Sequence, residues 1–219
     1  MSLTLYYHPL SSFCWKALIA LYETGTEFEP VVVNFGDEAS AAAFKAVWPI
    51  GKFPVLRDGA SGEVVPESTI IIEWLAQRSS AGAALIPADP QRALRVRRAD
   101  RFYDLHVHMQ MQAIVGDRLR PEGARDPLGV EKARALMATA LGMAERDLAG
   151  REWTAGEEFS MADCAAAPAL FYADKVAPLA PAHPNLVAYL ERLKARPSFA
   201  RVLEEAGPYF RFFPEEPAD

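Results

Sequence analysis

Two short apolar runs separated by a helical pattern constrain the fold of this 219-residue chain more than any other feature. Residues 3–7 and 28–33 are apolar, aromatic or β-branched, which is typical of buried strands. Between the runs, apolar residues recur at helical spacing from Ser11-Ser12, which can cap a helix, to a stop at Gly25. A helix between two such strands predicts a parallel βαβ unit with a right-handed crossover.

The segment that follows completes a compact α/β domain. Residues 39–47 are rich in alanine and predict a helix that ends at Trp48-Pro49. Residues 54–57 and 63–65 flank the turn Asp58-Gly59, which predicts an antiparallel hairpin. Residues 67–78 carry apolar side chains on one helical face. The order β-α-β-α-β-β-α predicts an α/β domain of the thioredoxin-like fold over residues 1–79.

Beyond residue 79 the pattern changes from mixed α/β to all-α. Residues 80–89 are rich in Ser, Gly, Ala and Pro, and we interpret them as a linker. Residues 90–219 show helical periodicity, so an all-helical C-terminal domain is expected. The expected helices are 90–118, 128–149, 161–176, 184–195 and 197–205. Ser160 and Asp163 resemble a capping box at the start of the third of these helices.

Composition excludes several classes of function. A net charge of -6 and a pI near 5.3 disfavour nucleic-acid binding, because that binding needs a basic surface. The basic run 92–101 is a local exception, which we interpret as a solvated or interface face rather than a polyanion site. Cys14 and Cys164 suggest neither a disulfide framework nor a metal site. With no apolar stretch of membrane-spanning length, we expect a soluble, cytoplasmic protein without membrane partners.

The junction between the first strand and the first helix is the best candidate for chemistry. The first-turn N–H groups and the helix dipole favour an anion there, and a thiolate is such an anion. We expect Ser11 to donate a hydrogen bond to a thiolate supplied by a bound cofactor, with Ser12 as the cap or a second donor. Alternatively, both serines are only caps. Cys14 is either a redox nucleophile with a lowered pKa or a small buried hydrophobic residue.

Two further segments carry features that suit a peptide ligand. Pro54 is a candidate cis proline at the entrance to the hairpin, where an exposed strand edge can pair with a peptide. Glu67 and Ser68 open another helix, so a carboxylate, a hydroxyl and backbone N–H groups are available for the charged end of an amino acid.

The order and spacing of these segments resemble the cytosolic glutathione transferases over nearly the whole chain. Residues 5–7, 11–16 and 19–21 look like the first strand and helix of the serine-type classes, most nearly the zeta class. Residues 48–56, WPIGKFPVL, look like the family segment Asn-Pro-x-Gly-Lys-Val-Pro-x-Leu, and Glu67-Ser68 matches the family's Glu-Ser pair. The resemblance implies glutathione as co-substrate, a homodimer, no metal and a cis peptide bond before Pro54.

The resemblance also implies roles for individual residues. Ser11 would activate glutathione, Val55 would pair its backbone with the cysteinyl part, and Lys52 would lie near the glycyl carboxylate. The residues expected to bind glutathione are Lys52, Phe53, Pro54, Val55, Glu67 and Ser68. We expect the acceptor pocket to be lined by Pro9, Leu10, Phe102, Asp104, His106 and Met109. The aromatic tail, Tyr209, Phe210, Phe212 and Phe213, would either fold over the site or pack on the helical core.

Three reactions begin from the same thiolate and stay open at this point. Attack on an electrophile, for which we favour an apolar one, would make the chain a glutathione transferase. Glutathione-dependent isomerisation of the maleylacetoacetate type is an alternative, and so is a thiol oxidoreductase that uses Cys14. A non-enzymatic binding protein could keep the same fold.

Overall fold

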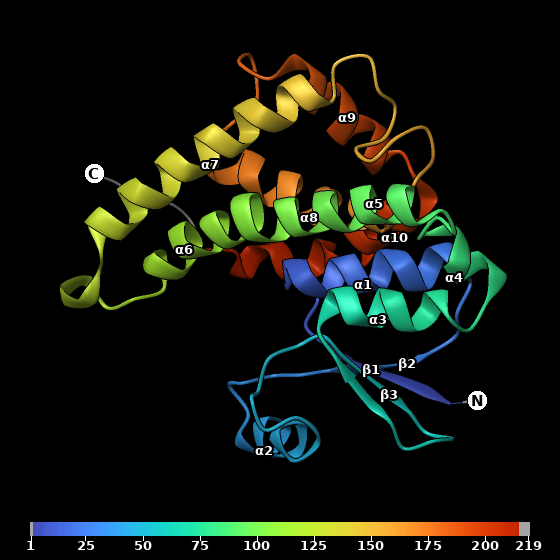
Figure 1. The fold of residues 1–219 in the computed structure, drawn as a ribbon. Coiled ribbons are helices and arrows are strands. Elements are labelled where there is room, and N and C mark those ends of the chain that lie inside the picture. The colour runs from blue at the N-terminus through green and yellow to red at the C-terminus, as the bar shows by residue number, and fades with distance from the viewer. Residues whose placement is uncertain (1, 215–219) are drawn as a thin grey trace.

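The N-terminal half of the computed structural model has the predicted thioredoxin-like order (Figure 1). The structure describes residues 2–214. The elements of this domain are β1 (Leu3–Tyr7), α1 (Ser12–Glu23), β2 (Glu29–Val32), α2 (Glu38–Val47), β3 (Val55–Asp58), β4 (Val64–Pro66) and α3 (Ser68–Ala76). The two hairpin strands each begin one residue later than the sequence pattern indicated.

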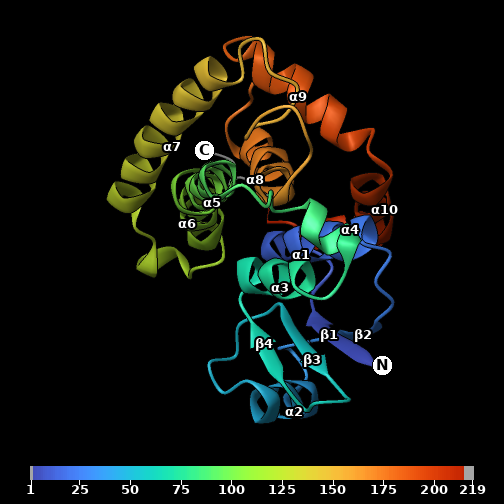
Figure 2. The ribbon, with the colours of Figure 1, turned by 45° about the vertical axis from the view of Figure 1, so that its right-hand side comes forward.

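The four strands form one sheet in the order β2-β1-β3-β4. β1 pairs with β2 in parallel and with β3 in an antiparallel arrangement. Helices α1 and α3 lie side by side on one face of the sheet, and α2 covers the other face (Figures 1 and 2). The central strands are buried, with Leu5 and Leu56 fully enclosed.

The expectation that the second strand is buried was wrong. β2 is an edge strand, and Glu29, Pro30 and Val32 are exposed. Pro30 has no N–H to donate to a further strand, so an edge position suits it. Val33, which directly follows the strand, is the buried residue of this segment.

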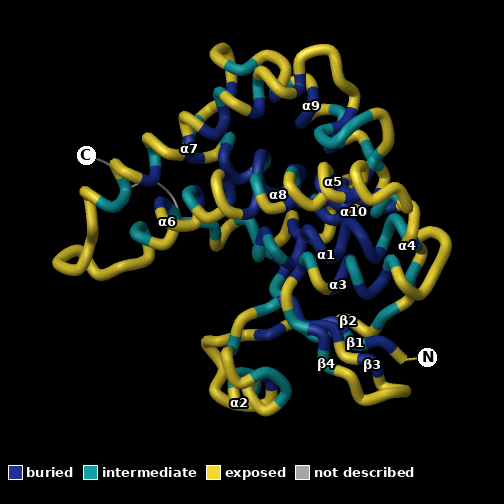
Figure 3. The backbone as a smooth tube through the Cα atoms, in the orientation of Figure 1, coloured by how far each residue is buried: buried dark blue, intermediate teal, exposed yellow. Residues whose placement is uncertain are grey.

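Helix α1 lies between the sheet and the helical domain. Every residue from 14 to 21 is buried, because the helix packs on the sheet, on α3 and on helices of the second domain. Figure 3 shows this helix as a continuous buried stretch. The two domains therefore share one hydrophobic core through α1.

The second domain is helical as predicted. Its elements are α4 (Ser80–Ala84), α5 (Pro90–Phe102), the π-helical segment η1 (Tyr103–His108), α6 (Met109–Arg118), the 3₁₀ turn η2 (Glu122–Ala124), α7 (Pro127–Asp147), α8 (Met161–Val176), α9 (Pro184–Lys194), α10 (Pro197–Ala206) and the 3₁₀ segment η3 (Gly207–Phe212). The segment expected as a linker contains the short helix α4, which Ser79 caps by accepting the Gly82 N–H at 2.9 Å. Among residues 2–214, no helix combines the length and apolar character that a membrane span requires.

Helix α8 forms the centre of this domain. Its buried face is built largely of alanine, which allows α1 and α5 to approach closely. The predicted capping box is confirmed, with the Ser160 N–H donating to Asp163 Oδ2 at 2.9 Å. Asp163 also accepts the Thr154 N–H at 3.0 Å and the Tyr189 hydroxyl, so one carboxylate joins the helix start to two other segments.

Candidate functional site

Strand register brings the three predicted segments to one edge of the sheet. Tyr6 of β1 pairs with Val55 of β3, and Val55 pairs with Pro66 of β4. The chain segments that follow Tyr6, precede Val55 and follow Pro66 therefore leave the sheet at the same edge. These are the loop that leads to Ser11, the Phe53-Pro54 segment and the start of α3. Segments far apart in the sequence thus meet at a common site.

Ser11 is the N-cap of α1 and is half-buried. Its backbone is extended, with φ -77° and ψ 114°, and its Oγ accepts the Cys14 N–H at 3.4 Å. Capping uses a lone pair of the hydroxyl oxygen, so the hydroxyl hydrogen stays available for another acceptor. The Ser11 hydroxyl can therefore donate to an anion held at the positive end of the helix dipole.

The loop before Ser11 is fixed by hydrogen bonds from the core. Trp15 Nε1 donates to the Pro9 carbonyl at 2.5 Å, and the Tyr172 hydroxyl donates to the Leu10 carbonyl at 2.9 Å. Both donors lie in buried side chains. Pro9 is itself buried, so its assignment to an open acceptor pocket was wrong. Pro9 instead helps to fix the loop that positions Ser11.

Ser12 has a different environment from Ser11. It is buried, and its hydroxyl contacts the His108 Nε2 atom and, at 3.5 Å, the Gln112 amide nitrogen. Burial, with a smaller effect from Lys16, lowers the pKa of His108 to about 3, so its ring is neutral at neutral pH. The neighbouring Phe13 ring stacks on the same imidazole with centroids 3.9 Å apart. Ser12 thus links α1 to the helical domain.

The sequence prediction missed the contribution of His108. Asp104, His108 and Gln112 are spaced four residues apart and so share one helical face, on which all three contact α1 side chains. That spacing was the available signal.

Lys16 lies in a buried ion cluster at the domain boundary. Its side chain is 0% exposed, and its Nζ lies 2.5 Å from Asp100 Oδ1 and 2.7 Å from Asp104 Oδ2. The Thr69 hydroxyl of α3 accepts from the same Nζ at 2.7 Å, and Arg101 contacts both carboxylates. The assignment of Asp104 to the acceptor pocket was wrong, because its carboxylate is buried against Lys16.

Cys14 does not have the environment of a redox nucleophile. The side chain is fully buried, and burial raises the pKa of its thiol to about 12, against a smaller opposing effect of the Ser11 hydroxyl. A thiol with this pKa carries almost no thiolate at neutral pH. Of the two interpretations of Cys14, the structure supports the small buried hydrophobic residue, and the oxidoreductase alternative therefore has no nucleophile at this position.

The peptide bond between Phe53 and Pro54 is cis, as predicted. Val55 lies within the sheet, with β1 on one side and β4 on the other, so no open strand edge remains at this residue. The backbone edge expected at Val55 was therefore misplaced. The half-buried Phe53 precedes the paired residues, and its ring stacks on His8 and Phe35 with centroids 6.0 and 5.4 Å away. Lys52 is exposed beside it.

Glu67 has an unusual backbone conformation. Its φ is 71° and its ψ is 120°, and among residues 2–214 no other non-glycine residue has a positive φ. The residue is exposed at the start of α3, and its side chain makes no capping hydrogen bond with the helix. Ser68 follows it as a buried residue. The strain keeps the Glu67 carboxylate off the helix end, which leaves the first-turn N–H groups uncapped by it.

The remaining predicted residues lie on the helical side of this edge. His106 and Met109 are exposed and Leu10 and Phe102 are half-buried. Phe102 stands ten residues before Gln112, which contacts Ser12; this corresponds to roughly 15 Å along the helix. Met109 is only three residues from Gln112, so it lies much closer to Ser12 along the helix axis than Phe102 does.

The aromatic tail packs on the protein core beside the site. Phe210 contacts Trp15 with ring centroids 5.9 Å apart, and Phe213 stacks on Tyr172 at 5.6 Å. Tyr209 approaches His8 at 6.1 Å, whereas Phe212 is 62% exposed. Of the two expected positions, the structure shows packing on the core for Phe210 and Phe213.

A thioredoxin-like sheet domain followed by an all-helical domain is the architecture of the glutathione transferases. The comparison with protein families agrees. Residues 5–83 match the model of the glutathione S-transferase N-terminal domain, and residues 117–192 match that of the C-terminal domain. The chain belongs to the glutathione S-transferase family.

Individual relatives support the same assignment along the whole chain. Glutathione S-transferase 3 of Zea mays is 34% identical over 209 residues, covering 92% of this chain and 93% of its own. A solved glutathione S-transferase from Methylobacillus flagellatus, with glutathione bound, has a TM-score of 0.84 at 30% identity, covering 91% of this chain and 98% of its own. The structure from Methylobacterium radiotolerans, a complex with glutathione sulfonate, has a TM-score of 0.81 at 29% identity, covering 100% of this chain and 98% of its own. The predicted fold and enzyme class are confirmed.

Proposed function

We propose that this enzyme is a serine-type glutathione transferase in which Ser11 holds the glutathione thiolate for attack on an electrophile. The observation that carries the proposal is the N-cap position of Ser11, whose hydroxyl hydrogen remains available where three segments meet. The thiolate sulfur forms a bond to the electrophilic carbon, and a leaving group departs with the electron pair or an adjacent double bond takes it up.

The energy needed for this activation matches what the site offers. Lowering a thiol pKa from about 8.5 to about 6.5 requires roughly 2.7 kcal/mol. A hydrogen bond to a charged group contributes about 1.5 to 3 kcal/mol, and a helix N-terminus about 1 kcal/mol. Ser11 and the first turn of α1 are therefore sufficient together.

Glutathione would lie along the shared edge as an extended peptide. Pro54 is the first residue outside the β1–β3 ladder and has no N–H, so Phe53 is the first one that offers both backbone N–H and C=O for strand addition by the cysteinyl residue. The γ-glutamyl end carries an ammonium group for the Glu67 carboxylate and a carboxylate for the start of α3. Lys52 is exposed next to Phe53, where it suits the glycyl carboxylate. Each charged end of the tripeptide thus meets a complementary group.

The acceptor would bind against the helical domain. Leu10 and Met109 supply apolar surface near the start of α1. The carboxylate of Asp104 forms an ion pair with Lys16 and does not face this surface. An apolar electrophile suits this surface better than a small diacid, so we favour conjugation over isomerisation of the maleylacetoacetate type.

The direct test is conjugation of glutathione to an activated aryl halide by the purified enzyme, followed by the absorbance of the product. Calorimetric titration with glutathione measures binding separately. Binding with turnover supports the proposal. Binding without turnover for a panel of aryl halides, enals and epoxides would favour the non-enzymatic alternative.

Replacement of Glu67 separates binding from stability. We expect Glu67→Gln to raise the KM for glutathione by about 10- to 100-fold with little change in kcat, because a charged hydrogen bond to the ammonium group is lost. Glu67→Gly should raise KM similarly but increase the thermal stability, because glycine tolerates positive φ at little cost. An unchanged KM in both variants would remove Glu67 from the site.

We also propose that the enzyme is a symmetric dimer, built on the outer face of α3 and α5. Ile70 and Leu94 are 50% and 61% exposed there, and residues of β4, α3 and α5 line a cavity of about 590 Å³ beside Trp74. Arg97 donates to both Glu73 oxygens at 2.6 and 3.0 Å, which fixes the two helices to one another. Exposed apolar side chains on a rigid face suit a two-fold interface.

Sedimentation velocity tests this interface. The wild type should sediment as a dimer, and Ile70→Asp should shift it to the monomer, because a buried carboxylate without a partner opposes association. Leu128→Asp, on an exposed leucine at the start of α7, is the control that should leave the dimer intact. A monomeric wild type at micromolar concentration would contradict the proposed dimer.

A further inference from the structure

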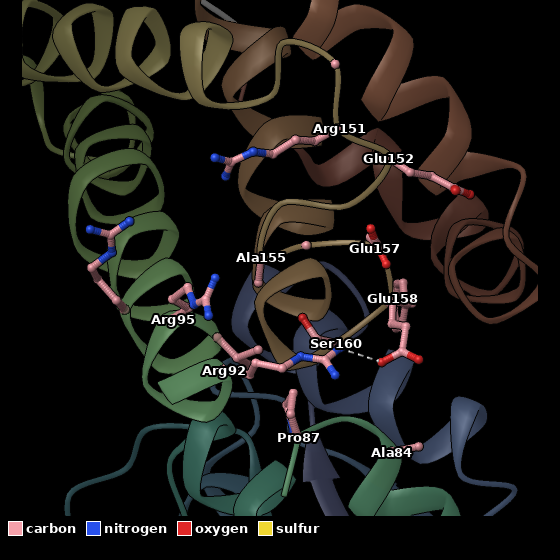
Figure 4. Close-up of a pocket in the computed structure, with 15 residues that line it drawn as sticks. Ala84, Pro87, Arg92, Arg95, Arg151, Glu152, Ala155, Glu157, Glu158 and Ser160 are labelled. Atoms are coloured by element: carbon pink, nitrogen blue, oxygen red, sulfur yellow. Dashed lines mark hydrogen bonds and ion pairs between the residues drawn. The ribbon is translucent and has the colours of Figure 1, made fainter. Parts of the chain in front are cut away.

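A second cavity lies far from the proposed glutathione site. It has a volume of about 690 Å³ and opens between α5, the end of α4 and the loop 150–160 (Figure 4). Arg95 on its wall stands 17 residues before Gln112 on the same continuous helix, which corresponds to roughly 25 Å along its axis. None of the residues that line the cavity belongs to β1, α1, the Phe53-Pro54 segment or α3. The cavity is therefore separate from the thiolate site.

The walls of this cavity carry a concentration of arginine. Arg92, Arg95 and Arg98 stand three residues apart on α5, and Arg151 follows α7 on the other side. Figure 4 shows Arg95 and Arg151 entering from opposite walls. Arg92 donates to Glu158 at 3.0 Å. Among the described residues, no carboxylate lies within ion-pair distance of Arg95, Arg98 or Arg151, although the chain has a net charge of -6.

Apolar groups complete the lining. Val96 is buried beneath the arginines, and Pro87, Ala155 and Phe159 add further apolar surface. The volume falls within the range of about 300 to 1,000 Å³ that small-molecule sites occupy. Glu152 and Glu157 lie on the wall away from α5 and disfavour an anion on that side (Figure 4). The cavity therefore combines an apolar base with a positive region at one side.

We propose that this cavity is a second ligand site, which binds a phosphate monoester with a small apolar body. A phosphate presents several anionic oxygens in different directions, so guanidinium groups from two walls can each make paired hydrogen bonds to it. A single carboxylate would need only one of them. The phosphate lies between Arg95 and Arg151, and the apolar body covers Val96 and Ala155. The site is independent of glutathione, because the two sets of residues do not overlap.

Calorimetric titration with phenyl phosphate at low salt tests the site. The wild type should bind phenyl phosphate more tightly than inorganic phosphate or phenol, since each of these probes supplies only half of the contacts. The double variant Arg95→Gln/Arg151→Gln should weaken binding at least about tenfold, because charged hydrogen bonds from two guanidinium groups are lost. Glu157→Gln should strengthen binding, because a repelling carboxylate is removed.

The matched control is Arg120→Gln/Arg125→Gln, which changes the net charge equally at exposed arginines outside the cavity. This control should bind phenyl phosphate as the wild type does. Both double variants should retain glutathione turnover and the wild-type melting temperature, which shows that they are folded. Absence of phenyl phosphate binding in the wild type overturns the proposal. An equal loss in the two double variants also overturns it, because attraction would then come from net charge alone.

Discussion

Ser11→Ala is expected to lower kcat/KM for glutathione conjugation by roughly 100-fold at neutral pH, comparable with the loss of one preorganised donor to a developing anion. The variant removes the hydroxyl that donates to the thiolate and leaves the fold of the loop intact. That loop is fixed by Trp15 and Tyr172 rather than by the serine side chain. The pH dependence of turnover gives the sharper test.

Without Ser11, the pKa of the bound thiol should rise toward the free value of about 8.5. The deficit of the variant should therefore be large at neutral pH and shrink as the pH rises through that value, because hydroxide then ionises the thiol. Thiolate absorbance in the ultraviolet measures the same pKa directly. Ser11→Thr retains a hydroxyl and should retain much of the activity.

Cys14→Ala is the control for the thiol alternative. It removes a buried thiol with a pKa near 12 and should leave turnover close to that of the wild type. If Cys14→Ala abolished turnover and Ser11→Ala did not, the serine mechanism would be wrong.

Lys16→Met should have the largest effect on stability, about 3 to 5 kcal/mol, because it removes the buried cation of two buried carboxylates and leaves them only the half-exposed Arg101. Both Asp100 and Asp104 lie within 2.7 Å of the Lys16 ammonium, and all three side chains are almost completely buried. For a chain of this size the loss corresponds to a decrease in Tm of roughly 10 °C. Thermal unfolding followed by circular dichroism measures it.

Arg97→Met provides the comparison with an exposed ion pair. Arg97 and Glu73 also join α3 to α5, but the Arg97 side chain is 45% exposed. Solvent screens this pair, so the substitution should cost at most about 1 kcal/mol. Similar losses in the two variants would show that Lys16 has no special role at the domain boundary.

The order of strands and helices could be predicted from sequence because hydrophobic periodicity and helix caps are local signals. Ser11 and Ser12 were both predicted as possible caps of the first helix, of which Ser11 is the N-cap, and the Ser160–Asp163 box was predicted directly from its spacing. The meeting of the three ligand segments was expected only from the resemblance to the glutathione transferases, because the strand order of the sheet was not predicted.

Features that depend on contacts between distant segments could not be predicted in the same way. A β-branched sequence is compatible with an edge strand and with a central strand of a sheet, so the sequence did not predict the exposure of β2. Phe53 and Val55 are only two residues apart, and which of them has a free backbone depends on where the pairing with β1 ends. His108 and Asp104 acquire their roles only when α1 packs against η1.

The burial of α1 on all sides has a consequence for the relation between the two domains. The helix belongs to the first domain by sequence, yet α8 and α10 cover one of its faces. An isolated N-terminal fragment would expose this apolar face and the unpaired Lys16 to water. The border near residue 80 therefore divides two sequence patterns but not two units of cooperative unfolding. If the helical domain were replaced by that of a relative, the relative's counterparts of α8 and α10 would have to fit this face of α1.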